Sequence, residues 1–477
     1  MRSPEVIARL PFWVVTVCLA VAVLCAVALR WTETLPISPW EPAIAMEGVR
    51  LNAGLPIYEA GHATHIYGPL LTGLIAAVFR LFGFNLLAAR MAFSLFGFAL
   101  ASLLTIIFCR REPAFYWFLG FLLFLAVNFR ANLIFLTAQP DCAALFFAAL
   151  GLYLWATRGK SWIRWTGSLA LFVAALLTKQ TAAALALMPF VYALLWTRPL
   201  KLSTVIQSLI PCAIVVTALG AIRWFWPQVY FAMVTVPAAI KVNFANVSGM
   251  AVYLLGTFPL FIVALLATLR LTRGENDRER WIWAAIVVLL PVSIWTICKS
   301  GGSYNSLLPA YLAMTALFVV KLEAIFQWLA SLRPWRGLVA STVIALAILL
   351  SVFVQFDRDL SLLFLRCGDE KRPAAMAIAQ RLGSGVICPQ DPSIAYLANG
   401  YFGRSLFFEL DTHARQGNWP DQLPDSLAQE MAKAKYVVRV WSYVPTRVFD
   451  DYLQEGQFKP ISVPELKGSA YTVWKRR

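Results

Sequence analysis

Charged residues are scarce in this chain of 477 residues, since Asp, Glu, Lys and Arg together make up only 14% of it. Hydrophobic residues make up 60%, and the mean hydropathy is +0.68. A soluble globular protein of this size does not need so much apolar surface, so the composition excludes that class and predicts a polytopic membrane protein. The sequence also shows no glycine-rich phosphate loop ahead of a helix, no internal repeat and no low-complexity segment.

Histidine and cysteine are few as well, with 3 and 8 residues. The cysteines have no metal-type spacing, and His62 and His65 lie three residues apart without a further clustered ligand. No metal ligand is therefore predicted, and a divalent cation stays an open alternative. Cys367 and Cys388 lie in the polar tail, where they either pair, if the tail is extracytoplasmic, or remain free thiols.

The net charge of +16 does not indicate a nucleic-acid partner, because most Lys and Arg form short clusters between apolar runs. This is the pattern of the positive-inside rule. The first apolar run follows a short basic start and is long enough to be an anchor rather than a cleaved signal peptide. The runs predict about eleven transmembrane helices: Leu10–Leu29, Leu86–Phe108, Ala114–Phe129, Cys142–Ala156, Trp165–Thr178, Thr181–Trp196, Val205–Ile222, Ala251–Leu269, Trp281–Cys298, Leu307–Val320 and Leu338–Val354.

One further run, Pro69–Phe84, decides on which side the loops lie. It has about 16 residues, roughly 24 Å of helix, and contains Arg80. If it lies in the interface plane, the basic clusters all fall on the cytoplasmic side with the N-terminus; if it crosses, the first three move outside. We predict an in-plane amphipathic helix on the outer face, with crossing as the alternative. The clusters are Arg110/Arg111, Arg158/Lys160/Arg164, Arg198/Lys201, Arg270/Arg273/Arg278/Arg280 and Arg333/Arg336.

From about Gln355 the chain becomes polar, with short alternating runs. We predict a transmembrane domain over residues 1–356, with its first outer loop at 31–87, and a small extracytoplasmic α/β domain over residues 357–477. An odd number of spans places this domain on the side of the first loop. The predicted strands are Gly385–Cys388, Ser405–Leu410, Tyr436–Val440 and Tyr471–Trp474. The predicted helices are Pro373–Leu382 and Ser426–Lys435, with Asp425 as N-cap of the second.

The first outer loop holds four of the few carboxylates, and each is costly beside a bilayer unless it has a use or a partner. Glu41 is the candidate general base, because glycosyl transfer needs a carboxylate to take the acceptor's proton. A helix-capping or solvated Glu41 is the alternative. Glu47 is a candidate for substrate binding, and its alternative role is an ion pair with Arg50. The four carboxylates are Glu33, Glu41, Glu47 and Glu59.

Candidate residues on later outer loops share this side of the membrane. Asp141 is the only acid on the outer side between Glu59 and Asp357, which favours a second site carboxylate over a helix-dipole charge. Lys179 interrupts an apolar stretch and, with Lys241 and Lys299, would suit a lipid-linked phosphate, whereas snorkelling is the alternative for each. In the turn Gly301–Asn305, Tyr304 or Asn305 could hydrogen-bond a sugar.

Taken in order along the chain, these motifs resemble those of the GT-C glycosyltransferases of the protein mannosyltransferase and lipid A aminoarabinose transferase type. The resemblance covers roughly Leu10–Val320, and the polar tail is similar to the family's variable C-terminal domain. The matching pieces are Glu41 with Gly54-Leu-Pro-Ile-Tyr58, Tyr67 with Pro69–Gly83, Ala89-Arg90 with Ser94, Asp141, Leu177-Thr178-Lys179, and Gly301 to Pro309.

The resemblance implies that Glu41 and Asp141 are catalytic and that Lys179 and Lys241 lie near a lipid phosphate, with Tyr67 also at the site. Two positions depart from the family. Many members have Asp-Glu where this chain has Trp40-Glu41, and Tyr67-Gly68-Pro69 replaces a motif that begins with a cation. Both departures leave the donor and the acceptor open.

The sequence therefore predicts a multi-pass enzyme of the bacterial inner membrane, an inverting hexosyl or pentosyl transferase. It would move a sugar from a polyprenyl-phosphate carrier to a lipid, glycan or protein acceptor at the outer face. The alternatives are a transporter or flippase of lipid-linked sugars and a catalytically silent relative. Ionisable groups at the edges and the lack of repeated halves disfavour a transporter. The sugar, the acceptor, the metal requirement and the oligomeric state do not follow from the sequence.

Overall fold

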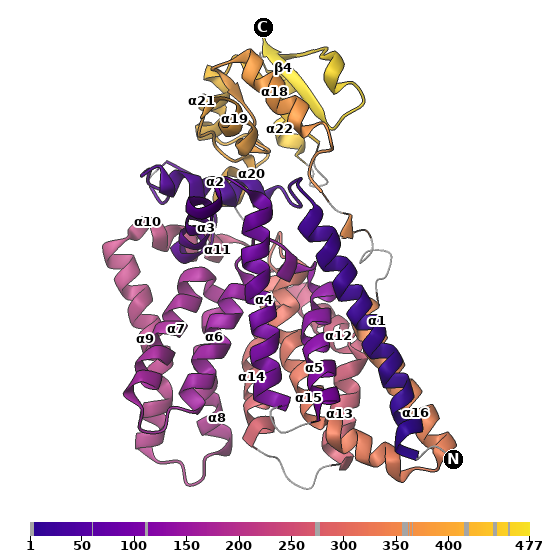
Figure 1. Ribbon diagram of the computed structural model, residues 1–477. Coiled ribbons are helices and arrows are strands. Elements are labelled where there is room, and N and C mark those ends of the chain that lie inside the picture. The colour runs from indigo at the N-terminus through magenta and orange to yellow at the C-terminus, as the bar shows by residue number, and fades with distance from the viewer. Residues whose placement is uncertain are drawn as a thin grey trace.

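The computed structural model describes residues 4–59, 61–109, 113–271, 277–354, 361, 363–364, 366–414, 419–441, 446–456 and 458–477. A bundle of long helices carries a small C-terminal domain on one end, which we call the domain end; the N-terminus lies at the opposite end (Figure 1). The predicted boundary between residues 356 and 357 falls outside the described residues.

The long helices form from the predicted apolar runs, and α15 lies at the centre of the bundle. Of the apolar window of α15, 78% is buried, against 22% for α9. The helices of the bundle are α1 (Pro4–Thr32), α4 (Leu86–Cys109), α5 (Ala114–Ala126), α6 (Asp141–Ala156), α7 (Trp162–Thr178), α8 (Met188–Trp196), α9 (Leu202–Phe225), α12 (Phe244–Gly256), α13 (Pro259–Leu271), α14 (Asp277–Ile297), α15 (Leu308–Ser331) and α16 (Pro334–Phe353). The shorter connecting helices are η1 (Val127–Ala131), η2 (Ile134–Leu136), η3 (Gln180–Leu187), α10 (Pro227–Tyr230), η4 (Phe231–Thr235), α11 (Val236–Ala239) and η5 (Tyr304–Leu307).

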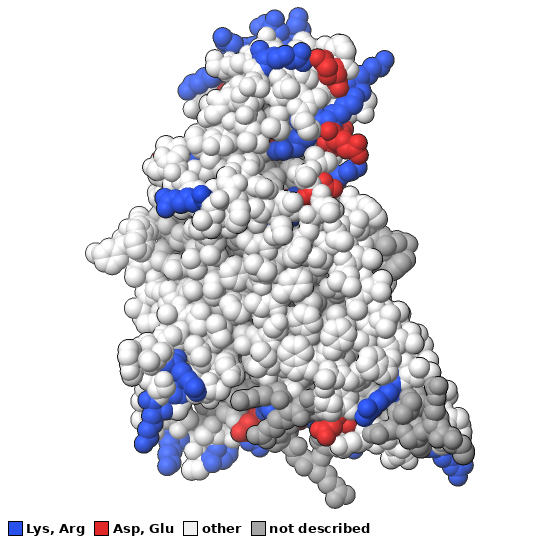
Figure 2. All heavy atoms as spheres, viewed as in Figure 1, with Lys and Arg blue, Asp and Glu red and all other residues white. Residues whose placement is uncertain are grey.

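The chain is a polytopic membrane protein. Seven described helices are long and apolar enough to cross a membrane, or eight if the pair α12–α13, bent by 71°, is one span. Three shorter apolar segments, α6, α7 and Gln180–Trp196, would complete the predicted eleven, and this total stays a prediction. On the face shown in Figure 2, a belt without charged side chains separates the charged C-terminal domain from basic residues at the opposite end. Of the predicted basic clusters, Arg110, Arg111 and Arg273 lie outside the described residues.

Two helices at the domain end do not follow the bundle. Helices α2 (Trp40–Asn52) and α3 (Pro69–Phe82) share an apolar cluster, and Figure 1 shows both beneath the C-terminal domain. Gly48 permits this packing, because a Cβ there would lie 2.6 Å from a methyl carbon of Ile75. Helix α3 therefore lies beside α2 at the domain end, and its predicted place in the plane of the membrane stays a prediction.

The C-terminal domain is a four-stranded sheet with helices on both faces. The strand order is β1 (Val386–Ile387), β2 (Tyr436–Val440), β4 (Tyr471–Arg476), β3 (Phe458–Ile461), with β1 parallel to β2 and the other pairs antiparallel. Alternation along β2 points Val438 to one apolar cluster and Val437 to the other. The helices of this domain are α18 (Arg372–Leu382), α19 (Pro392–Asn399), α20 (Leu406–His413), α21 (Asp425–Lys433) and α22 (Arg447–Glu455), with the short η6 (Pro464–Leu466).

Two local predictions for this domain are wrong, and one alternative that the sequence left open is decided. Ser405–Leu410 is not a strand, because Ser405 precedes α20 and the other residues belong to this helix, whose apolar side chains reach both the domain core and α2. Periodicity alone does not separate such a short apolar run from a helix. Asp425 is the first residue of α21 and not its cap, since Pro424 precedes the helix without a side-chain bond. Cys367 and Cys388 are both buried and form no disulfide, which is one of the two alternatives that the sequence left open.

Candidate active site

Asp141 is the centre of a polar cluster at the domain end. It opens α6, where the positive end of the helix dipole favours a carboxylate, and its side chain is only 5% exposed. Its Oδ1 lies 2.6 Å from the Nζ of Lys179, and the amide of Asn305 lies 3.3 Å from Oδ1 and 3.4 Å from Oδ2. The fold thus brings together three predicted site residues, of which Asn305 is 164 positions from Asp141.

A break in the helix after α7 positions Lys179 at the cluster. The helix stops at Thr178, and Lys179 has an extended backbone (φ −152°, ψ 118°) before η3 begins. The apolar stretch is therefore two helical pieces, and the break turns the ammonium group toward Asp141. A lysine at such a position is stabilised by this carboxylate and does not need to reach the lipid headgroups.

Tyr67 borders the same cluster from the first loop. Its ring centroid lies 5.5 Å from the Nζ of Lys179, within the range of a cation–π contact. The next residue, Gly68, passes so close to the carbonyl of Leu177 that a Cβ would clash with it. Burial raises the pKa of the Tyr67 hydroxyl, and the negative charges of Asp141 and Asp411 raise it further.

Glu41 lies in a different, fully buried ion pair. Arg90 of α4 donates from Nε to Oε1 (2.7 Å) and from Nη2 to Oε2 (2.9 Å), while the backbone N–H of Ile37 donates to Oε2 (2.8 Å). Arg90 also donates to the backbone carbonyls of Glu33 and Leu35, so it fastens the segment between α1 and α2 onto α4. The catalytic role of Glu41 stays a prediction, and in this structure both of its oxygens are occupied.

Of the remaining first-loop acids, Glu47 and Glu59 pair with neighbours in the same loop, whereas Glu33 lies 3.9 Å from Arg366. Glu47 accepts from His62 (Oε1 to Nε2, 3.2 Å), whereas Arg50 contacts Glu59 at 3.4 Å. The alternative pairing of Glu47 with Arg50 is therefore wrong, because the loop folds back and brings His62 to Glu47. The other Glu47 oxygen, Oε2, is buried without a hydrogen-bond partner.

His65 takes part in a different network from His62. Its Nε2 lies 2.6 Å from the hydroxyl of Thr72, and its Nδ1 accepts from the backbone N–H of Tyr67. Burial lowers the pKa of His65 to about 4, so the ring is neutral near pH 7. Within the described residues, no three His, Cys, Asp or Glu side chains gather as a metal site would require.

The other predicted substrate-binding residues lie in neighbouring loops. The segment before α12 pairs with the loop after α14 through Val242 and Lys299, and the Nζ of Lys299 donates to the carbonyl of Pro237 (2.6 Å). Lys241 is exposed, and the ring of Tyr304 lies 6.4 Å from that of Tyr253. The structure therefore does not add Lys241 and Lys299 to the contacts of Asp141.

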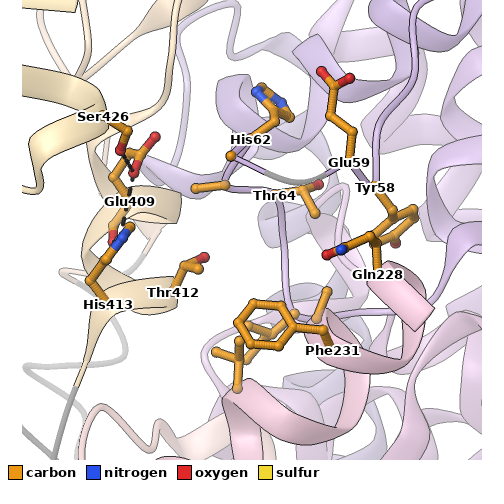
Figure 3. Close-up of a pocket in the computed structure, with 15 residues that line it drawn as sticks. Tyr58, Glu59, His62, Thr64, Gln228, Phe231, Glu409, Thr412, His413 and Ser426 are labelled. Atoms are coloured by element: carbon orange, nitrogen blue, oxygen red, sulfur yellow. Dashed lines mark hydrogen bonds and ion pairs between the residues drawn. The ribbon is translucent and has the colours of Figure 1, made fainter. Parts of the chain in front are cut away.

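A cavity of about 380 Å³ lies between the first loop, the C-terminal domain and the segment from α10 to α11; we call it the polar cavity because charged and hydroxyl side chains project into it between apolar wall residues. Figure 3 shows His62, Glu59 and Tyr58 on one side of it, facing Glu409 and His413 of α20 across the opening. This cavity adjoins the polar cluster, because Tyr58 donates its hydroxyl to the carbonyl of Tyr67 (2.8 Å). It is large enough for a sugar ring or a short polar segment.

An apolar groove of about 320 Å³ lies on the other side of the cluster, within the bundle. Its lining begins with Leu145, one turn after Asp141, and Pro309, one turn after Asn305. It ends beside Phe108 and Arg278, near the end of the bundle opposite the domain. The walls come mostly from α4, α6, α14 and α15, with Leu185 of η3 and Met188 of α8, and their apolar side chains suit a hydrocarbon chain.

Arg90, Arg130 and Asp411 are examples of buried or half-buried charged residues that were not among the predicted site residues. Arg90 pairs with Glu41, and Arg130, 4% exposed, donates to Thr257 (2.7 Å) and to the hydroxyl of Tyr311 (3.2 Å). A charge beside or within an apolar run is a usable signal, because it needs a partner there. Asp411 carried no such signal, since it follows a run that was assigned to a strand.

Neither a protein-family model nor a curated protein matches the sequence. Solved structures do match its fold. ArnT from Cupriavidus metallidurans bound to undecaprenyl phosphate aligns with a TM-score of 0.56 at 13% identity over 98% of each chain, and its apo state with 0.53 over 97% of each. The Archaeoglobus fulgidus oligosaccharyltransferase tethered with an acceptor peptide aligns with 0.51 at 13% identity, over 88% of this chain and 68% of that one. The chain has the GT-C fold that the sequence resemblance implies.

Proposed function

We propose that this protein is a GT-C glycosyltransferase that moves a sugar from a polyprenyl-phosphate carrier to a lipid, glycan or protein acceptor. The observation that carries the proposal is the junction of the Asp141–Lys179–Asn305 cluster with the apolar groove, which begins one helical turn away. A polyprenyl phosphate has the matching chemistry, with one anionic end and one long apolar tail. The neighbouring structure of ArnT was solved with undecaprenyl phosphate.

In this proposal the phosphate of the donor lies at Lys179. Charge-assisted hydrogen bonds from a lysine stabilise the negative charge that grows on the phosphate as the sugar leaves. Without donor, Asp141 holds the lysine in place; with donor, the carboxylate and the Asn305 amide would orient the acceptor or the sugar. Tyr67 closes the site from the first loop.

The acceptor would enter through the polar cavity between the first loop and the C-terminal domain. His62, Glu59, Glu409 and His413 offer donors and acceptors for hydroxyl or amine groups. Among the described loops of the bundle, basic clusters such as Arg158/Lys160/Arg164 and Arg198/Lys201 lie at the end opposite the C-terminal domain. We therefore further propose that this opposite end is cytoplasmic, with the N-terminus, and that the domain end faces the outside of the cell membrane.

A transporter or flippase of lipid-linked sugars is the second candidate, and the 71° bend between α12 and α13 favours it, because transporters use broken helices. Sealed proteoliposomes with polyprenyl-phosphate [14C]sugar and an acceptor extract separate the two. A transferase forms labelled acceptor and free polyprenyl phosphate, and Lys179→Met abolishes this, whereas Lys201→Met at the opposite end does not. Movement of intact donor between leaflets without product would instead identify a flippase.

A further inference from the structure

Side chains from three distant parts of the chain line the polar cavity (Figure 3). The first loop contributes Thr64, helix α20 contributes Thr412, and the segment from α10 to α11 contributes Gln228 and Phe231. The cavity volume of about 380 Å³ lies in the range of small-molecule sites. A sugar ring, a phosphate group or a short peptide would each fit by size, so the chemistry of the lining decides between them.

The acidic and histidine side chains of this lining already have partners. Each of them lies within hydrogen-bonding or ion-pairing distance of a group of the opposite kind, and Lys and Arg are not found among the described lining residues. The pairs are His62–Glu47 (3.2 Å), Glu59–Arg50 (3.4 Å), Glu409–Arg404 (2.7 Å) and His413–Glu409 (3.6 Å). A charged ligand would have to break one of these pairs or keep its own charge uncompensated, and both are costly.

The polar groups that remain free in the lining are neutral. The hydroxyl oxygen of Thr64 is buried without a hydrogen-bond partner, and Thr64 is only 5% exposed. Within the described part of the chain, neither the hydroxyl of Thr412 nor the side-chain amide of Gln228 makes a hydrogen bond. Hydroxyl and carboxamide groups both donate and accept, so they match the hydroxyl groups of an uncharged ligand. A ligand that bonds with Thr64 also removes the penalty of an unsatisfied buried group.

Phe231 adds an apolar face to these neutral polar groups. It begins η4, a π-helical turn, and its side chain is 44% exposed. Turns of this kind are rare and occur frequently at functional sites. Ala232 and Val236 extend the apolar wall on the same side of the cavity. An aromatic ring beside a few neutral hydrogen-bonding groups suits a sugar, because a sugar ring has an apolar C–H face and hydroxyl groups at its edge.

From this lining we propose that the polar cavity binds an uncharged sugar, so that the acceptor of the reaction is a saccharide. The inference rests on the proposed function and names its acceptor class. The sugar ring would pack on Phe231, and its hydroxyl groups would bond with Thr64, Thr412 and Gln228. A phosphate acceptor would meet no cation in the described lining, and an amine acceptor would meet only carboxylates that are already paired.

The wall of the cavity also reaches the cluster at which the donor phosphate is proposed to bind. Ile66 lines the cavity, and its carbonyl accepts from the side-chain amide of Gln180 (3.1 Å), the residue after Lys179. Tyr58 lines the cavity as well and donates its hydroxyl to the carbonyl of Tyr67, whose ring contacts Lys179. The segment Ile66–Tyr67 therefore belongs both to the wall of the cavity and to the surroundings of Lys179.

The test measures transfer from a 14C-labelled polyprenyl-phosphate sugar by the full-length protein in proteoliposomes. The acceptors are methyl and octyl glycosides of glucose, galactose, mannose and N-acetylglucosamine, with octyl phosphate, octylamine and a tripeptide of Asn, Ser and Thr as competing classes. We expect product with at least one glycoside; a lower KM for its octyl form identifies a lipid-anchored saccharide, and an equal KM identifies a free one.

Variants of the lining test whether this saccharide binds in the polar cavity. Phe231→Ala and Thr64→Val should each raise the KM for the glycoside at least about tenfold, with the KM for the donor unchanged. The matched controls are Phe225→Ala and Thr235→Val, exposed residues of the same types outside the cavity lining, which should keep the wild-type KM. If Thr64→Val does not fold, Thr412→Val on the opposite wall replaces it.

Two results would overturn the inference and leave the proposed function in place. One is product with the phosphate, amine or peptide acceptor and with no glycoside; the other is a wild-type KM for the glycoside in both lining variants. A protein that forms no product with any acceptor contradicts the proposed function itself. Binding of the methyl glycosides, followed by saturation-transfer NMR, then still tests the cavity: a signal lost in Phe231→Ala but kept in Phe225→Ala supports the sugar site, and equal signals in both reject it.

Discussion

The buried ion pair between Glu41 and Arg90 gives a prediction that separates a structural from a catalytic glutamate. Glu41 is 1% exposed and Arg90 is not exposed at all, and the carboxylate accepts three hydrogen bonds. Glu41→Gln keeps the shape but leaves the guanidinium buried without a counter-charge. Breaking a buried pair from one side costs about 3–5 kcal/mol of unfolding free energy.

A double-mutant cycle tests this magnitude. Glu41→Gln and Arg90→Met should each destabilise by about 3–5 kcal/mol, whereas the double variant should cost less than their sum, with a coupling of about 2–3 kcal/mol. The readouts are unfolding in mixed micelles and sugar transfer per folded molecule. The matched control is Lys321→Met, which breaks another buried pair, with Glu279, whose atoms lie 2.5 Å apart (side chains 2% and 1% exposed).

The structural account expects Glu41→Gln to lose stability but to keep transfer per folded molecule, as Lys321→Met does. A Glu41→Gln variant with wild-type stability and no transfer would refute it. That result would instead support the predicted role of Glu41 as general base.

Three further changes have defined outcomes. Gly68→Ala should push the first loop away from Leu177 and lower transfer at least tenfold, measured with donor in excess, because a Cβ clashes with the carbonyl there. The folded protein holds His65 neutral with a pKa of about 4, below the ordinary 6.5, so the unfolded state binds more protons between these values. Stability should therefore be complete above pH 6.5 and fall by about 3 kcal/mol as the pH drops to 4, and His65→Gln should flatten this dependence in unfolding curves. Ala313→Phe should fill the apolar groove and raise the KM for the lipid donor about tenfold, while a water-soluble donor with a short tail is less affected.

Much of the bundle could be predicted from the sequence, because a chain inside lipid must satisfy its backbone hydrogen bonds internally and therefore forms helices. Apolar runs become helices, and scarce charges such as Asp141 and Lys179 need a partner, so each is informative. The pairing itself could not be predicted, because it depends on how α7 ends and where α6 begins. Glu41 shows the limit of sequence analysis most clearly. A glutamate of the first-loop motif has the same sequence pattern whether it is catalytic or forms a buried ion pair with Arg90.

The C-terminal domain was less predictable. Its strands β1, β2 and β4 follow alternating runs, but Ser405–Leu410 is fully buried in a helix and shows no period that separates it from a strand. Tertiary packing onto α2 decides its structure. Because of this wrong strand prediction, the contact between Asp411 and Trp40 of α2 was not expected from the sequence.

The central claim is that Lys179 is the phosphate-binding cation and that Asp141 holds it until the donor arrives. Binding of polyprenyl phosphate to the purified protein, followed by 31P NMR, tests it most directly. Asp141→Asn frees the lysine and should tighten binding, whereas Lys179→Met should weaken it by about ten- to a hundredfold, the worth of a charge-assisted hydrogen bond. Equal affinity in the wild type and both variants would contradict the account.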